Sequence, residues 1–110
     1  MQDNEKLEEI CMTIIANSGA GRSSAFEALN LAKQGRYAEA DGMLATAHTQ
    51  FHDAHEAHRS LLQMDAQGEL GCPSVLVTHA QDHLMTSVRA EELIREIMLL
   101  YRKIDNQDKQ

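Results

Sequence analysis

Three long segments carry apolar residues at spacings of three and four, and this pattern limits the fold more than any other feature. In the first segment these residues are Leu7, Ile10, Cys11, Ile14 and Ile15. The second segment begins near Tyr37 and ends at a polar, turn-rich connection, residues 65–71; its predicted apolar face consists of Ala40, Leu44, Ala47, Phe51, Ala54 and Leu62. The third starts at Pro73, which suits the first helical position, and runs to about Ile104, before a charged tail expected to fray. Since no βαβ alternation or strand-length β-branched run is present, the sequence predicts an all-α, antiparallel three-helix bundle.

The first helix is predicted to be imperfect in its middle. Residues 17–21 read Asn-Ser-Gly-Ala-Gly, and two glycines beside an Asn–Ser pair weaken a helix strongly. A helix resumes with Ser23 or Ser24 as N-cap and ends near Lys33, followed by Gly35 at the C′ position. We therefore expect an interruption here, within one helical arm that is kinked between Gly19 and Gly21.

Composition sets the class of protein. A chain of 110 residues is long enough for one domain, predicted to span residues 1–110. With no Trp, two Tyr, two Phe and six Met, its core is built from small and flexible side chains, which favours association with other copies or a partner. The net charge of −7 argues against a nucleic-acid binder. We expect a cytoplasmic protein without a signal peptide, a membrane span or a disulfide framework, in which Cys11 is buried.

The third segment carries a polar patch. His79, Asp82 and His83 stand at offsets of zero, three and four, which places them on one helix face. The same face continues as a seam that also includes Val75, Leu76, Thr86, Ala90, Leu93, Ile94, Ile97, Tyr101 and Ile104. A polar patch on a seam that is geometrically buried costs several kcal/mol unless it is hydrogen-bonded, paired or metal-bound. Three interpretations remain open from these residues alone: a solvated helix face, a metal site, or an imidazole that accepts a phosphoryl group.

The second segment contains a ladder of histidines at helical spacing: His48, His52, His55 and His58. Imidazoles three and four residues apart can share a transition metal. No cysteine accompanies them, and the carboxylates of Asp53 and Glu56 are predicted to point elsewhere. We interpret the ladder as partly buried polar positions, one of which lines the cleft that His79 faces.

The glycine-containing segment also has a functional interpretation. Free backbone N–H groups and Arg22 could together hold an anion. The glycine spacing matches neither a P-loop nor a dinucleotide-binding fingerprint. From the sequence, a simple kink is the preferred interpretation.

Several short segments of the chain resemble the motifs of a known protein family, in the same order. The block His-Ala-Gln-Asp-His-Leu-Met-Thr-Ser at residues 79–87 resembles the active-site signature of the lactose/cellobiose-type enzyme IIA of the bacterial phosphoenolpyruvate:sugar phosphotransferase system. Further similar segments, in the same order, are Asn17-Ser18-Gly19, Arg22-Ser23, Ala28-Leu29, Ala32-Lys33-Gln34-Gly35 and Asp53-Ala54-His55. Two positions depart from the family pattern: Gly21 stands where Ala is common, and His58 where Gln is usual.

The resemblance implies a homotrimeric phosphotransferase component. His79 would accept a phosphoryl group from phospho-HPr on its tele nitrogen and pass it to a cysteine of the IIB component. Asp82 would meet its two symmetry copies on the threefold axis and bind one Mg²⁺ per trimer, with His83 and His55 as supporting residues. The membrane would be reached only through the IIC component. The resemblance implies a β-linked disaccharide (lactose, cellobiose or chitobiose) without choosing among them, because this component does not touch the sugar.

Two other classes of protein compete with this interpretation. A two-component histidine phosphotransfer domain is also helical with a surface histidine, but it usually has Lys and then Gly shortly after that histidine, where this chain has Gln81, Asp82 and His83. A non-enzymatic, histidine-rich metal-binding bundle would bind a transition metal through His48, His52 and His55.

Overall fold

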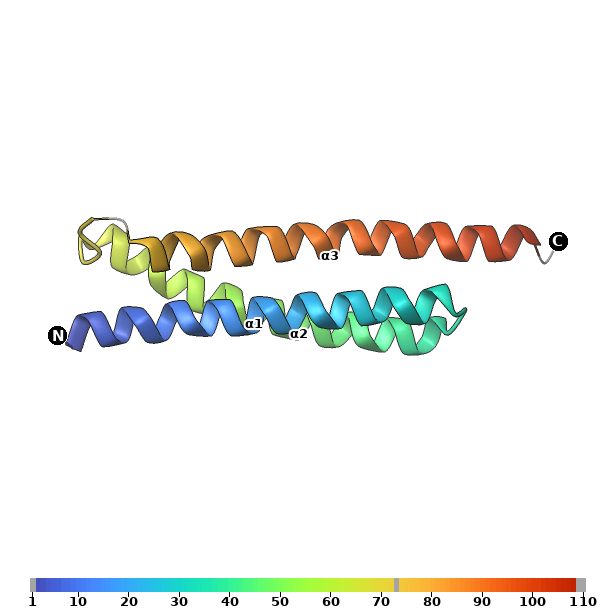
Figure 1. Cartoon of the computed structure of the whole chain (residues 1–110), viewed down its shortest axis with the longest axis horizontal. Helices are drawn as coiled ribbons and strands as arrows, with labels where there is room; N and C mark the ends of the chain where they lie inside the picture. Colours follow the sequence, from blue (N-terminus) through green and yellow to red (C-terminus); the bar gives the residue numbers. More distant parts are fainter. Residues whose placement is uncertain (1, 73, 109–110) are drawn as a thin grey trace.

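The chain forms three long helices, as predicted. The computed structural model describes residues 2–72 and 74–108, in which the helices are α1 (Gln2–Lys33), α2 (Tyr37–Ala66) and α3 (Val75–Asp108). Figure 1 shows α1 and α2 running in opposite directions, with α3 alongside them and parallel to α1. The bundle measures 63 × 18 × 17 Å, and the two ends of the chain lie at its opposite ends (Figure 1). The described residues contain no strand, and the antiparallel all-α bundle is confirmed.

The predicted interruption of the first helix is wrong. α1 continues without a break through residues 17–21, and neither Gly19 nor Gly21 has a positive φ. The structure gives Gly21 a packing role, because a Cβ on this residue would lie 2.7 Å from a ring carbon of Phe51 on α2. Gly21 therefore lets two helices approach closely, whereas Gly35, at φ 78°, ends a helix as predicted. A kink without a break stays a prediction.

The ends of α3 differ from the prediction. Pro73 lies outside the described residues, and the hydroxyl of Ser74 accepts a hydrogen bond of 3.1 Å from the N–H of Val77, as an N-cap does. The helix continues past its predicted end near Ile104 to Asp108, so residues 106–108 of the tail that was expected to fray are helical, and residues 109–110 of that tail lie outside the described residues. Two contacts explain the extension. The Tyr37 hydroxyl donates a hydrogen bond to the carboxylate of Asp105, and Arg102 donates one of 2.5 Å to Asp41.

The core consists of two apolar clusters, one toward each end of the bundle. The predicted apolar face of α2 is confirmed for Ala40, Leu44, Ala47, Phe51 and Ala54, all of which are buried. Leu62, predicted on the same face, is 51 % exposed, and its neighbour Leu61 is buried in its place. Cys11 is buried as predicted, and this burial raises the pKa of its thiol. The folded subunit thus buries mostly small side chains, as the composition indicates.

One face of α3 remains uncovered. α3 packs mainly against α1 and little against α2, so part of its circumference has no neighbour within the chain. Among the exposed residues of α3, one set follows at spacings of three, four or seven, and we call it the outer stripe: Val75, His79, Asp82, Thr86, Leu93, Ile97, Leu100 and Ile104. The prediction that this seam is buried is therefore wrong for the single chain. Ile94 and Tyr101, assigned to the same seam, turn toward the core instead.

Candidate functional site

His79 and Asp82 are neighbours on the outer stripe. Both side chains are exposed, and they line a shallow hollow together with Ser74, Val75 and Thr78. The carboxylate of Asp82 forms no ion pair among the described residues, while its backbone carbonyl accepts a hydrogen bond of 2.7 Å from Thr86. The desolvation cost predicted for a buried polar patch therefore does not arise within one chain. His79 is open to an approaching molecule.

His83 is placed one helical turn after His79 and is half-buried. The two imidazole rings meet edge to face, with 4.4 Å between their centroids and 80° between their planes. Such a contact restricts the orientations open to the His79 ring. His83 also lines a second hollow, formed on the other side by the α1 residues Gly19, Arg22, Ser23 and Phe26. The structure therefore joins the segment around Arg22 to the histidine pair, which sequence reasoning did not predict.

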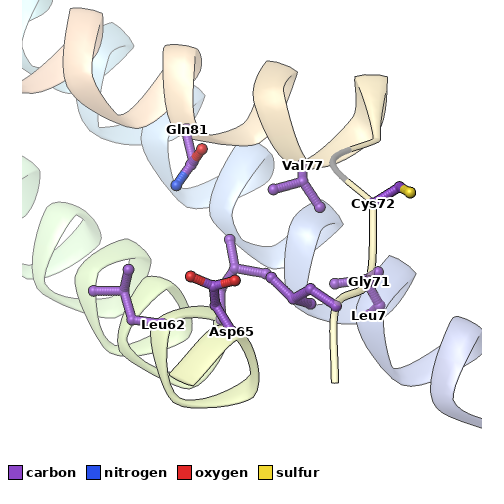
Figure 2. A pocket seen from close by; sticks show the side chains of 9 residues that line it. Leu7, Leu62, Asp65, Gly71, Cys72, Val77 and Gln81 are labelled. Atoms are coloured by element: carbon purple, nitrogen blue, oxygen red, sulfur yellow. The ribbon is translucent and has the colours of Figure 1, made fainter. Parts of the chain in front are cut away.

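Gln81 points away from His79, toward α2 at the end of the bundle where α3 begins. Figure 2 shows its side chain directed into a hollow whose other walls include Leu62 and Asp65 of α2. Its amide nitrogen lies 3.4 Å from Nε2 of His58. Burial, and then the nearby His55, lower the pKa of His58, which favours the neutral ring that accepts a hydrogen bond from the amide. The signature block thus uses two faces of α3, one for His79 and Asp82 and one for Gln81.

His55, predicted as a supporting residue, belongs to a different hollow. Its exposed side chain lies between α2 and α3 in a hollow whose other residues are His58, Leu84, Met85, Val88, Arg89 and Glu92. Within one chain the structure does not bring His55 to the hollow of His79. The same holds for His58, so no histidine of α2 lines the His79 hollow.

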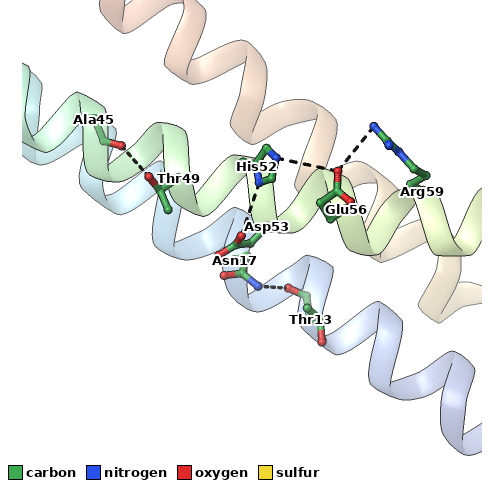
Figure 3. Close-up of polar contacts among 8 residues, drawn as sticks. All are labelled: Thr13, Asn17, Ala45, Thr49, His52, Asp53, Glu56 and Arg59. Carbon is green, nitrogen blue, oxygen red and sulfur yellow. Dashed lines mark hydrogen bonds and ion pairs between the residues drawn. The ribbon is translucent and has the colours of Figure 1, made fainter.

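The histidine ladder of α2 forms a solvated surface. His48 and His52 are exposed, and Figure 3 shows His52 between Asp53 and Glu56, at 3.7 Å and 4.0 Å. The prediction that these carboxylates point elsewhere is therefore wrong. In residues 2–72 and 74–108, no three His, Cys, Asp or Glu side chains converge in a way that could hold a metal ion. This finding counts against a histidine-rich metal-binding bundle.

Asp82 alone is a poor ligand set for a magnesium ion. Mg²⁺ prefers six oxygen ligands in octahedral geometry, and the His79 hollow offers one carboxylate. Because Asp82 is exposed on the outer stripe, copies of the chain that meet along this stripe would bring several such carboxylates together. The donor chemistry fits Mg²⁺ better in such an assembly, where several carboxylates share the ion.

The site around His79 contains few reactive groups. An exposed imidazole stands on a rigid helix, its ring faces a second imidazole, and Asp82 is the charged side chain among the residues that line its hollow. A positioned ring nitrogen can accept a small group and release it again without further covalent machinery. Fold and site together define an all-α bundle that presents an imidazole able to accept and release a small group.

Comparison with known proteins gives the family. Residues 9–102 match the model of the phosphotransferase system lactose/cellobiose-specific IIA subunit, and the chain belongs to this family. It is 46 % identical to the N,N′-diacetylchitobiose-specific EIIA component of Escherichia coli K12, over 91 % of this chain and 86 % of the relative. It is 41 % identical to the lichenan-specific enzyme IIA component of Bacillus subtilis, over 94 % of both chains.

Solved structures agree with the sequence comparison. The cellobiose-specific enzyme IIA from Bacillus anthracis superimposes with a TM-score of 0.85 and 44 % identity, over 89 % of this chain and 90 % of that one. The solution structure of IIA(chitobiose) in its complex with HPr gives a TM-score of 0.80 and 40 % identity, over 90 % and 96 % of the chains. The chain is therefore a phosphotransferase component, and a two-component phosphotransfer domain is not favoured. Nowhere in the described residues is there a helix long and apolar enough to cross a membrane.

Proposed function

We propose that this chain carries a phosphoryl group on His79, which it takes from phospho-HPr and passes to a cysteine of the IIB component. The observation that carries the proposal is the position of His79, the first residue of the signature block, exposed on a rigid helix and held by His83. A relative that is 40 % identical has been solved as IIA(chitobiose) in complex with HPr, which supports the choice of donor.

The transfer needs two displacements at phosphorus. In the first, the lone pair of a neutral His79 ring nitrogen, the tele nitrogen by family resemblance, attacks phosphorus as the P–N bond to the donor breaks. The electron pair of that bond returns to the donor imidazole. In the second, a cysteine thiolate attacks, an S–P bond forms, and the P–N bond to His79 breaks with its electron pair returning to the ring. Because His79 is exposed, both partners can reach it in turn.

We propose further that the chain is a homotrimer assembled along the outer stripe. The apolar half of the stripe, Leu93, Ile97, Leu100 and Ile104, is exposed by 58, 39, 59 and 52 % in the single chain. A contiguous apolar surface of this kind marks an interaction site, and spacings of four and three are those of a coiled coil. Three copies in parallel around one axis would bury this half and bring the His79 ends together.

On this axis Asp82 would bind magnesium, one ion per trimer. Three carboxylates brought to one point repel strongly unless a cation neutralises them, and oxygen ligands suit Mg²⁺. The ion would supply charge neutralisation between the subunits. The test is Asp82→Leu, which should abolish magnesium binding and leave trimers in light scattering; a variant that appears only as a monomer would contradict this assignment.

The sugar is a β-linked disaccharide in this proposal. Relatives of 46 and 41 % identity are named for N,N′-diacetylchitobiose and lichenan. Another relative, from Streptococcus mutans and 41 % identical, is named for lactose. We place the relay in the cytoplasm, where the chain meets the membrane only indirectly through the IIC component.

The identity of the phosphoryl donor distinguishes the proposal from its alternatives. The purified chain is incubated with radiolabelled phospho-HPr or with a radiolabelled, phosphorylated receiver domain. We expect label only from phospho-HPr. Label taken from the receiver domain would make the chain a two-component phosphotransfer protein. Stoichiometric transition-metal binding, lost when His48, His52 and His55 are replaced, would favour the metal-binding bundle.

A further inference from the structure

Arg22 differs from every other arginine of the chain. The other five each lie within 3.6 Å of a carboxylate, in the pairs Arg36–Glu39, Arg59–Glu56, Arg89–Glu92, Arg95–Glu91 and Arg102–Asp41. Arg22 forms no ion pair and no hydrogen bond with its side chain in the part of the chain that the structure describes. In a chain of net charge −7, where carboxylates outnumber cations, a guanidinium left without one is free to bind an anion.

The surroundings of Arg22 offer hydrogen-bond donors and room. The hollow between α1 and α3 is lined by Gly19, Arg22, Ser23, Phe26 and His83, and none of these is acidic. The guanidinium carbon of Arg22 lies 5.7 Å from the centroid of the Phe26 ring, a cation–π contact that limits where the charge can move. A Cβ added to Gly19 would meet nothing within 4 Å, so this wall of the hollow is open.

The hollow lies next to the phosphoryl carrier. His83, its wall on α3, is the residue whose ring contacts His79 at 4.4 Å between centroids. A phosphoryl group on His79 would carry close to two negative charges and three acceptor oxygens, the chemistry that a guanidinium fork recognises. Among the pockets that touch the histidine pair, the His79 hollow contains a carboxylate, Asp82, whereas the Arg22 hollow contains a cation.

We propose that Arg22, assisted by the hydroxyl of Ser23, binds the phosphoryl oxygens of phospho-His79 and holds the group in the hollow between α1 and α3. This inference rests on the proposed role of His79. No bond is made or broken in this contact: Arg22 and Ser23 donate N–H and O–H hydrogen bonds to the oxygens. Because the contact exists only in the phosphorylated chain, it shifts the exchange equilibrium with HPr toward phospho-His79.

The test uses the full-length chain and two ways of loading it. Phosphoramidate phosphorylates histidine chemically, with ammonia as the leaving group, and so reports on Arg22 without HPr; His79→Gln identifies the signals that belong to other histidines. We expect the Nε–H resonance of Arg22 to shift when His79 is loaded, and the Nε–H resonance of Arg59 to stay unchanged. An Arg22 resonance that does not move while His79 is fully loaded would overturn the inference.

The second measurement is the equilibrium constant for phosphoryl exchange with HPr. Arg22→Gln should shift it roughly tenfold toward phospho-HPr, since one charge-assisted contact is lost. Arg22→Lys should recover part of the shift, and Arg59→Gln, an exposed arginine on α2, is the matched control and should leave the constant unchanged. An equilibrium constant for Arg22→Gln within twofold of the wild type would contradict the proposal.

The two measurements separate this inference from the function on which it rests. If phospho-HPr donates to His79 and Arg22 shows no response, only the inference fails. If Arg22 responds to chemical loading but phospho-HPr does not donate, the relay fails and the phosphoryl contact stands. If neither donor loads His79, both are wrong.

Discussion

The imidazole rings of His79 and His83 lie edge to face, with 4.4 Å between their centroids and 80° between their planes. His79 is exposed and His83 is half-buried, so the second ring acts as a fixed wall against the first. A surface side chain ordinarily samples several rotamers, and only some of them point a ring nitrogen at an incoming phosphorus. The contact therefore orients the residue that we propose as the carrier.

Replacing His83 tests this orienting role. His83→Ala removes the wall and should lower the rate of phosphoryl uptake by His79 about tenfold, because misplaced ring orientations become populated. His83→Phe keeps an aromatic ring there and should stay closer to the wild-type rate. Initial rates of label uptake from phospho-HPr measure both variants. Equal rates for His83→Ala and the wild type would show that the contact does not orient His79.

The two glycines of α1 should respond in opposite ways to the same substitution. Gly19→Ala adds a methyl group that meets nothing within 4 Å, so it should raise the free energy of unfolding by about 0.5–1 kcal/mol through helix propensity. Gly21→Ala places the methyl group 2.7 Å from the Phe51 ring and should lower the free energy of unfolding by about 1–3 kcal/mol.

Urea denaturation at one protein concentration measures both changes. Gly21→Ala combined with Phe51→Leu is the control, since the smaller side chain makes room for the methyl group and should recover part of the loss. A stabilising Gly21→Ala in the presence of Phe51 would show that the ring moves away at little cost. The close approach of the Phe51 ring is the contact that favours Gly at position 21 in this chain.

His58 should make stability depend on pH. Burial, followed by the charge of His55, lowers the folded-state pKa of His58 below its ordinary 6.5. Below pH 6.5 the unfolded chain therefore takes up a proton that the folded chain resists, and stability falls with pH until the folded-state pKa is passed. His58→Gln cannot titrate and removes this contribution.

The measurement is urea denaturation of the wild type and His58→Gln between about pH 7.5 and about pH 5.5. The free energy of unfolding of the wild type, relative to that of His58→Gln, should decrease as the pH falls. If the free energy of unfolding of the two proteins changes with pH in the same way, the His58 pKa is the same in the folded and unfolded chains.

Leu99 and Leu100 provide a matched test of the proposed trimer interface. Both are 59 % exposed in the single chain, but only Leu100 lies on the outer stripe. Leu100→Lys should dissociate the trimer, because it places three cations along one apolar contact, whereas Leu99→Lys should leave it intact. Light scattering gives the mass, and circular dichroism shows whether each subunit remains helical. Trimers of unchanged mass for Leu100→Lys would place the interface elsewhere.

The sequence predicted the helices well because their apolar periodicity is regular. It failed at the Gly19–Gly21 segment, where propensity argues for a break but α1 continues as a helix, with Gly21 packed closely against Phe51 of α2. It also failed at the end of α3, since the contacts of Arg102 with Asp41 and Asp105 with Tyr37 join residues far apart in the chain. Local patterns do not contain such contacts.

The candidate site was predictable in part. The spacing of His79, Asp82 and His83 correctly put the first two on one face, and the block carried the family resemblance, which the comparisons confirm. The expectation of a buried seam was wrong for the single chain, because periodicity identifies an apolar face and not what covers it. Arg22 entered the sequence prediction as an anion ligand beside free backbone N–H groups, and a simple kink was the preferred interpretation of that segment. Its unpaired charge and its place beside His83 depend on the packing of α1 against α3.

Mapping the phosphorylated residue after loading with radiolabelled phospho-HPr tests the central claim most directly. The account predicts one labelled histidine in the wild type, His79, and no label in a folded His79→Gln variant. Label on His83, or on any histidine that persists in His79→Gln, would contradict the assignment of His79 as the phosphoryl carrier.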